Sequence, residues 1–123
     1  MAVKKRILCI SDDESLLTSR KLLLEQEGYM VLPAFGVTEA TQICRTDPRF
    51  DLIVMGNSIP QSDKRKLVEM LRPRCKAPVL SIRKPHELPI PEAQFSVDSM
   101  DGPGALIEVV RTALADKPNS ASS

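Results

Sequence analysis

The feature that most constrains the fold is a short apolar run that recurs between helix-like segments. Its clearest copy is Asp51–Met55, which reads DLIVM, and another lies at Arg6–Ile10, which reads RILCI. Runs of this kind are typical of strands buried on both faces of a parallel sheet. Further strands are expected over 29–35, 78–82 and 95–98.

Amphipathic segments separate these runs. Their apolar residues recur at helical spacing and predict helices over 14–27, 38–46, 62–71 and 104–115. The stretch 83–94 carries three prolines, and proline inside a helix costs ~3 kcal/mol, so a loop is expected there. Pro33 favours an edge position for its strand. The alternation predicts an α/β fold with an open parallel sheet of five strands and helices on both faces.

Length and composition limit the class of protein. The chain has 123 residues, which is one domain, and a net charge of +1. The charge gives no reason to expect nucleic-acid or membrane-surface binding. No apolar run is long enough for a membrane span or a signal peptide, so a cytoplasmic protein is expected. We expect a domain over 1–116 and a disordered tail over 117–123.

The chain has too few cysteine and histidine residues for a structural zinc site. The chain has three cysteines and one histidine, and no two cysteines form a CxxC pair. The cysteines are expected to be reduced, with Cys9 and Cys44 buried as small apolar residues. His86 lies in the proline-rich stretch and is expected to be exposed.

Polar residues gather where such a sheet would bind ligands. Open α/β sheets bind beyond the carboxyl ends of their strands, where the strand order reverses. For the order 2-1-3-4-5, that point lies between the strands at 6–10 and 51–55. It is bounded by Asp12 and Asp13 on one side and by residues 56–58 on the other.

Several ordered motifs over nearly the whole chain resemble those of response-regulator receiver domains, the CheY-like phosphoacceptor modules of two-component signalling. The matching segments are ILCISDDE at 7–14, LEQEGY at 24–29, the Gly36, Glu39 and Ala40 set, DLIVM at 51–55 followed by Pro60, and PVL at 78–80. The resemblance implies a flavodoxin-like sheet in the order 2-1-3-4-5. Because 83–94 is short and rich in proline, the fourth helix of that family is expected to be reduced or absent.

The phosphoacceptor chemistry of that family is missing. The resemblance places the acceptor aspartate four residues before Pro60, where this sequence has Gly56. Glycine has no side chain to form an acyl phosphate. Asn57 cannot replace it, because neighbouring strand residues point to opposite faces and an amide is not a carboxylate nucleophile.

The switch positions implied by the resemblance are altered as well. The hydroxyl residue that ends the fourth strand corresponds to Arg83, and the basic residue after the fifth strand corresponds to Ser99, or to Asp98 with a register shift of one. The aromatic switch position falls near Ser96, beside Phe95.

The acidic pair has two interpretations. By resemblance, Asp12 and Asp13 with the carbonyl of Ser58 would hold Mg²⁺, but without a third carboxylate the site should be weak. Acidic residues at a helix N-terminus are also favoured as caps and by the helix dipole. Arg83 could pair with Asp12 or Asp13 and replace the metal, or it could point to solvent.

The expected function is a stand-alone degenerate receiver, or pseudo-receiver, in bacterial-type phosphorelay signalling. It would not be an enzyme and would need no cofactor beyond weak Mg²⁺. It would act by contacting a signalling protein, either a histidine kinase or a downstream effector, as a monomer or weak dimer. Two alternatives stay open: phosphorylation at a non-standard residue such as Ser58 or Asp63, and a flavodoxin-like domain that binds a small ligand in the same crevice.

Overall fold

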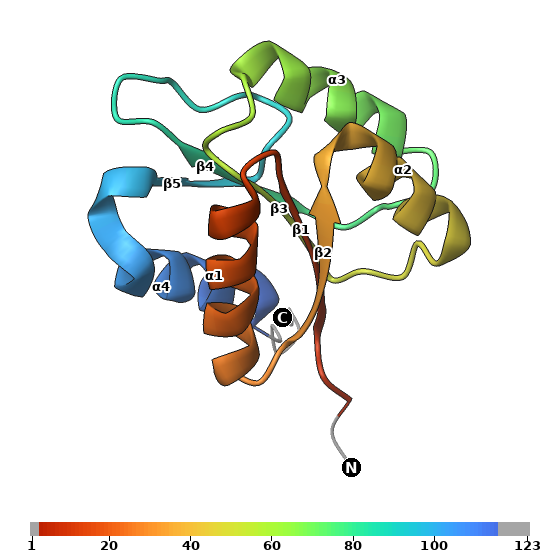
Figure 1. The fold of residues 1–123 in the computed structure, drawn as a ribbon, viewed down its shortest axis with the longest axis horizontal. Coiled ribbons are helices and arrows are strands. Elements are labelled where there is room, and N and C mark those ends of the chain that lie inside the picture. The colour runs from red at the N-terminus through yellow and green to blue at the C-terminus, as the bar shows by residue number, and fades with distance from the viewer. Residues whose placement is uncertain (1–2, 116–123) are drawn as a thin grey trace, which may run out of the picture.

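The computed structural model describes residues 3–115. It contains a sheet of five parallel strands in the order β2-β1-β3-β4-β5 (Figure 1). The predicted fold class and strand order are therefore confirmed. The expected tail over 117–123 lies outside the described residues. The strands are β1 (Arg6–Ser11), β2 (Met30–Phe35), β3 (Leu52–Met55), β4 (Val79–Arg83) and β5 (Phe95–Asp98).

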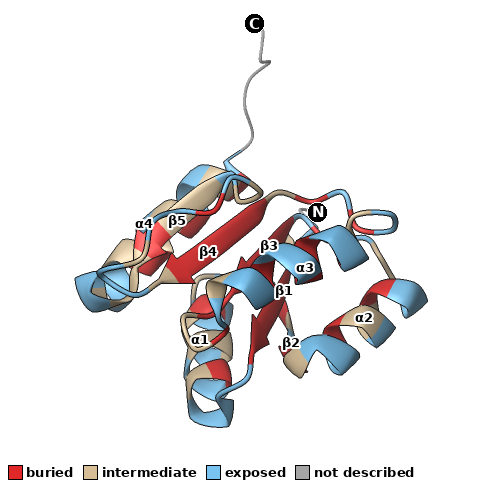
Figure 2. Ribbon diagram, turned by 90° about the horizontal axis from the view of Figure 1, so that it is seen from above, coloured by how far each residue is buried: buried red, intermediate tan, exposed pale blue. Residues whose placement is uncertain are grey.

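Helices cover both faces of this sheet. One face carries α1 (Glu14–Gln26) and α4 (Gly102–Leu114), and the other carries α2 (Gly36–Thr46) and α3 (Gln61–Leu71) (Figure 1). A short 3₁₀ helix, η1 (Ser99–Asp101), joins β5 to α4. Each face has its own apolar cluster, and the central strands between them are buried (Figure 2). β1 and β3 are nearly free of solvent contact, which explains their unbroken apolar sequence.

The edges of the sheet agree with the sequence. Pro33 lies in β2, an edge strand, where its missing N–H costs no ladder bond on the open side.

The helix over 38–46 starts earlier than predicted, at Gly36, which has a φ of 82°. Glu39 accepts a hydrogen bond from the Phe35 N–H at 2.8 Å and so holds this helix start. The α4 start at Gly102 is likewise two residues earlier than predicted.

The segment between β4 and β5 contains no helix, as the prolines predicted. Two side chains of α3 hold this segment. Gln61 donates to the Leu88 carbonyl at 2.6 Å, and Arg65 pairs with Glu92 at 3.0 Å. Ile90, a residue of this segment, is buried in the apolar cluster on the α2–α3 face. In the described part of the chain, no helix is both long and apolar enough to cross a membrane.

Candidate functional site

The carboxyl ends of β1 and β3 bring the predicted site residues together. The Gly56 N–H donates to the Ile10 carbonyl at 2.9 Å and ties the end of β3 to β1. The hydroxyl oxygens of Ser11 and Ser58 lie 3.3 Å apart across the same gap. Asp12, Asp13, Gly56 and Ser58 therefore follow adjacent strands at one edge of the sheet, as the topology predicted.

Asp13 acts as the N-cap of α1. Its carboxylate accepts a hydrogen bond from the Leu16 N–H at 3.1 Å, and its own N–H donates to the Ser11 hydroxyl at 3.0 Å. Both Asp12 and Asp13 are exposed. The structure thus supplies a structural role for one of the two carboxylates, in agreement with the capping interpretation.

Close approach of other groups, and not its backbone conformation, distinguishes Gly56. A positive φ occurs at Gly28, Gly36 and Gly102 but not at Gly56. A Cβ atom at Gly56 would lie 2.9 Å from Nη1 of Arg20 and 3.2 Å from the Ile10 carbonyl oxygen. The guanidinium of Arg20 therefore occupies the space that a side chain at the end of β3 would enter.

Arg20 reaches this place from the second turn of α1. Its Nη2 donates to Oδ1 of Asn57 at 2.6 Å. Arg20 was not among the predicted site residues, although the sequence contains a signal for it. It lies at helical spacing between Leu16 and Leu23, so a basic residue interrupts the apolar stripe of the helix.

The charge on Arg20 is poorly compensated. Its Nη1 is buried and has no hydrogen-bond partner, and within residues 3–115 no carboxylate forms an ion pair with it. Burial lowers the pKa of Arg20, while the neighbouring Cys9 and Asp13 oppose that shift. A partly buried cation with an unpaired donor destabilises a fold.

We therefore expect Arg20→Met to raise the free energy of unfolding by about 1–2 kcal/mol, because methionine fills similar space without an unpaired donor. The measurement is urea unfolding at pH 7. Lys21→Met, at the neighbouring position on α1, is the control for loss of one positive charge. A variant less stable than the wild type would show that the Asn57 bond outweighs the burial of the charge.

Arg83 does not pair with the acidic residues, so that hypothesis is wrong. Its Nη1 donates to the Glu87 carbonyl at 3.2 Å, and its Nε lies 3.5 Å from the Ser96 hydroxyl. The reason is the sheet order: β3 lies between β4 and β1, which puts Arg83 two strand spacings, roughly 10 Å, from the end of β1. The guanidinium turns towards β5 instead.

The other altered switch positions lie on the β4–β5 side. Ser96 is in β5, in register with Ser81 of β4. Ser99 begins η1 directly after β5 and lines a cavity between α1 and α4.

His86 is exposed, as expected. All three cysteines are buried and free, and burial raises the pKa of Cys9 to about 11 and that of Cys44 to about 12.

Lys64 is a second basic residue that was not among the predicted site residues. It lies in the first turn of α3 and is fully buried. Its ammonium donates to the Ser81 hydroxyl at 2.9 Å and to the Ile82 carbonyl at 2.6 Å. Burial lowers the pKa of Lys64 to about 8, with Arg20 and Lys84 adding to the shift and Glu87 opposing it. The site between β1, β3 and β4 therefore contains two basic side chains.

The residues present fit Mg²⁺ poorly. In the described range, no three His, Cys, Asp or Glu side chains cluster as metal ligands would. Asp13 already caps α1, Gly56 offers no carboxylate, and Arg20 brings a positive charge to the position beside it. Mg²⁺ requires several oxygen ligands in near-octahedral geometry.

Known proteins were compared with this chain by sequence and by structure. No family model matches the chain. The alkaline phosphatase synthesis transcriptional regulatory protein PhoP of Bacillus subtilis (strain 168) is 34% identical over 70 residues, which are 57% of this chain and 29% of the relative. The chain thus spans less than a third of that relative's length.

Solved structures match almost the whole chain. The receiver domain of the hybrid histidine kinase CckA is 25% identical with a TM-score of 0.75, over 89% of this chain and 98% of that domain. The chemotaxis protein CheY4 of Vibrio cholerae is 21% identical with a TM-score of 0.76, over 91% and 100%. A CheY-like receiver domain protein of Methanospirillum hungatei JF-1 is 21% identical with a TM-score of 0.78, over 97% and 100%.

Proposed function

We propose that the chain, which has the fold of CheY-like receiver domains, is a receiver domain of the response-regulator type. We propose that it is a pseudo-receiver, which acts in two-component signalling by contact with another protein and without phosphorylation. The observation that carries the proposal is the guanidinium of Arg20 at the end of β3, which lies where a side chain on Gly56 would be.

The chemistry of the site supports this proposal. Phosphoryl transfer to a receiver needs a carboxylate nucleophile and positive charge that is free to stabilise the incoming phosphoryl group. Gly56 supplies no nucleophile, and Nη2 of Arg20 is already bonded to Asn57. We propose that the domain is not an enzyme and has no need of Mg²⁺.

The alternative acceptors receive little support. The Ser58 hydroxyl faces the Ser11 hydroxyl, and no general base within the described residues is bonded to it. Asp63 is exposed in the first turn of α3. Ser58 lies near the acidic pair, but a serine hydroxyl without a bonded base is a weak nucleophile.

The partner proposed is a histidine kinase or a downstream effector, with the domain acting as a monomer or weak dimer. The receiver family has a helix between its fourth and fifth strands. In this chain, a segment without a helix, held by Gln61 and Arg65, takes its place. The surface next to α3 therefore differs in shape from that of the family. The three free thiols suit a reducing compartment, and we propose the cytoplasm.

The test is the intact mass of the protein after incubation with Mg²⁺ and a small-molecule phosphodonor. We expect no gain of a phosphoryl group, while a receiver domain that has the acceptor aspartate gains one under the same conditions. A gain in mass would contradict the proposal. Loss of that gain in Ser58→Ala or in Asp63→Asn would then identify the acceptor.

A further inference from the structure

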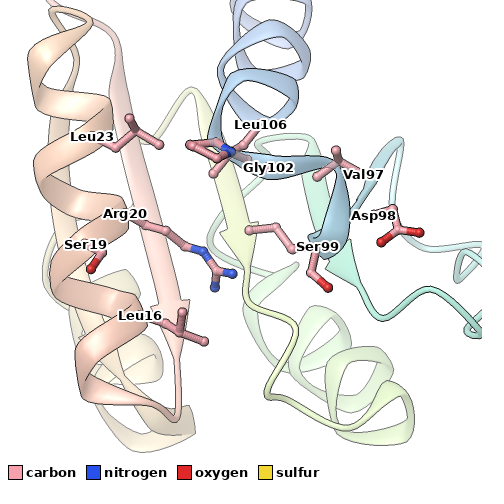
Figure 3. Close-up of a pocket in the computed structure, with 11 residues that line it drawn as sticks. Leu16, Ser19, Arg20, Leu23, Val97, Asp98, Ser99, Gly102 and Leu106 are labelled. Carbon is pink, nitrogen blue, oxygen red and sulfur yellow. The ribbon is translucent and has the colours of Figure 1, made fainter.

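A cavity of about 350 Å³ lies between α1 and α4, beneath the end of β5 (Figure 3). Its walls are mainly apolar. They include Leu16 and Leu23 from α1, Ile82 and Val97 from the sheet, and Leu106 from α4. A cavity of this size and lining is at the small end of those that bind organic ligands.

Arg20 is the positively charged group of this cavity. Its side chain extends from α1 into the space between that helix and Ser99 (Figure 3). The same side chain carries the buried Nη1 that has no partner. The hydroxyl groups of Ser19 and Ser99 also line the cavity.

One acidic residue, Asp98, belongs to the lining, but its carboxylate is engaged elsewhere. It accepts a hydrogen bond from the Met100 N–H at 2.8 Å and so caps η1. In Figure 3 its oxygens point away from Arg20. The cavity is therefore lined by a cation that forms no ion pair within the described residues, and its walls are mainly apolar.

We propose that this cavity binds a small organic monocarboxylate, with its carboxylate on Arg20 and its apolar body between α1 and α4. The ligand has on the order of ten non-hydrogen atoms, as the volume permits. A carboxylate would give the guanidinium a bidentate partner and would satisfy the donor that lacks one. To make these bonds, Arg20 would turn from Gly56 towards the cavity and exchange its hydrogen bond to Asn57 for the bonds to the ligand carboxylate.

The apolar walls also define what should not bind. Acetate has too little apolar surface to gain from burial, because burial contributes about 25 cal/mol per Å². A neutral amide of the same shape would leave Arg20 without an anion. Affinity should therefore need both the charge and the apolar body of the ligand.

The test is titration of the protein with hexanoate and benzoate, followed by NMR of the amide groups. We expect saturable binding with a Kd on the order of 1 mM or below, and shifts at residues of α1, β5 and α4. Hexanamide, benzamide and acetate should each bind at least about tenfold more weakly. Arg20→Gln should lose hexanoate and benzoate binding, whereas Lys21→Gln should keep it.

Three results would overturn the inference: no saturation by hexanoate or benzoate up to about 10 mM, equal binding of acid and amide, or full binding by Arg20→Gln. The amide comparison uses the wild-type protein, so it decides the point even if a variant folds poorly. The inference does not rest on the absence of phosphorylation. The mass measurement and this titration can each fail without the other.

Discussion

Replacing Gly56 with aspartate is expected to create a Mg²⁺ site only when Arg20 is removed in the same protein. In the single variant Gly56→Asp, the new carboxylate would lie against the Arg20 guanidinium, because the Cβ position is 2.9 Å from Nη1. The two groups would form an ion pair and the carboxylate would not be free for a metal. We expect the Mg²⁺ affinity of this variant to equal that of the wild type.

In the double variant Gly56→Asp with Arg20→Ala, the carboxylate would face Asp12 and Asp13 without the guanidinium of Arg20 beside it, while the ammonium of Lys64 stays bonded to Ser81 and to the Ile82 carbonyl. Adding one carboxylate ligand should raise the Mg²⁺ affinity by at least about tenfold over the wild type, or roughly 1.4 kcal/mol. Isothermal titration calorimetry with MgCl₂ measures it.

The matched control is Gly56→Asn with Arg20→Ala, which places a similar shape at the end of β3 without the charge. It should bind Mg²⁺ no better than the wild type. Equal affinity of the aspartate and asparagine double variants would contradict our account of the site. It would show that Asp12 and Asp13 are too far from the end of β3 to share a metal with it.

The fold could be predicted because each strand has a local signal. The buried runs at β1 and β3 have unbroken apolar sequence, and Pro33 marks an edge strand. The three prolines between β4 and β5 exclude a helix there by removing backbone donors. These signals need only the residues of one segment.

Only the part of the site that follows the strand ends could be predicted from the sequence. Sequence order and topology placed Asp12, Asp13 and Gly56 correctly, because they follow neighbouring parallel strands. Arg20 and Lys64 enter the site from helices, and only the packing of α1 and α3 on the sheet determines where such long side chains end. The wrong pairing of Arg83 has a different cause, because β3 separates β4 from β1 and so keeps Arg83 away from the acidic pair.

Arg20 and Lys64 together change the electrostatic character of the site. Each has a pKa lowered mainly by burial, and the charge of Arg20 contributes to the shift of Lys64. An acidic site would attract Mg²⁺ and stabilise both cations. Because Gly56 removes one carboxylate and the remaining two are exposed, the two basic residues meet little negative charge.

Lys64→Met is expected to abolish one contribution to stability, that of Lys64, which rises between pH 8 and pH 10.5 in the wild type. The pKa of Lys64 is about 8 in the folded protein and 10.5 for an ordinary lysine, so between these values the Lys64 side chain binds more protons in the unfolded state. The contribution of Lys64 to stability therefore rises with pH across this window, by at most roughly 3 kcal/mol, and is lost again as pH falls through 8.

The measurement is the difference in free energy of unfolding between wild type and Lys64→Met from pH 7 to pH 10. A difference is needed because burial raises the pKa values of Cys9 and Cys44, which lowers the stability of both proteins above pH 9. Lys66→Met, an exposed position on the same helix, should show no such trend.

A constant difference between wild type and Lys64→Met across this range would mean that Lys64 keeps an ordinary pKa despite its burial. If the methionine variant does not fold, NMR titration of the Lys64 side chain in the wild type gives the same answer. A midpoint near pH 8 agrees with a desolvated ammonium held by Ser81 and the Ile82 carbonyl. A midpoint near 10.5 would require a negative charge at the site strong enough to offset the desolvation.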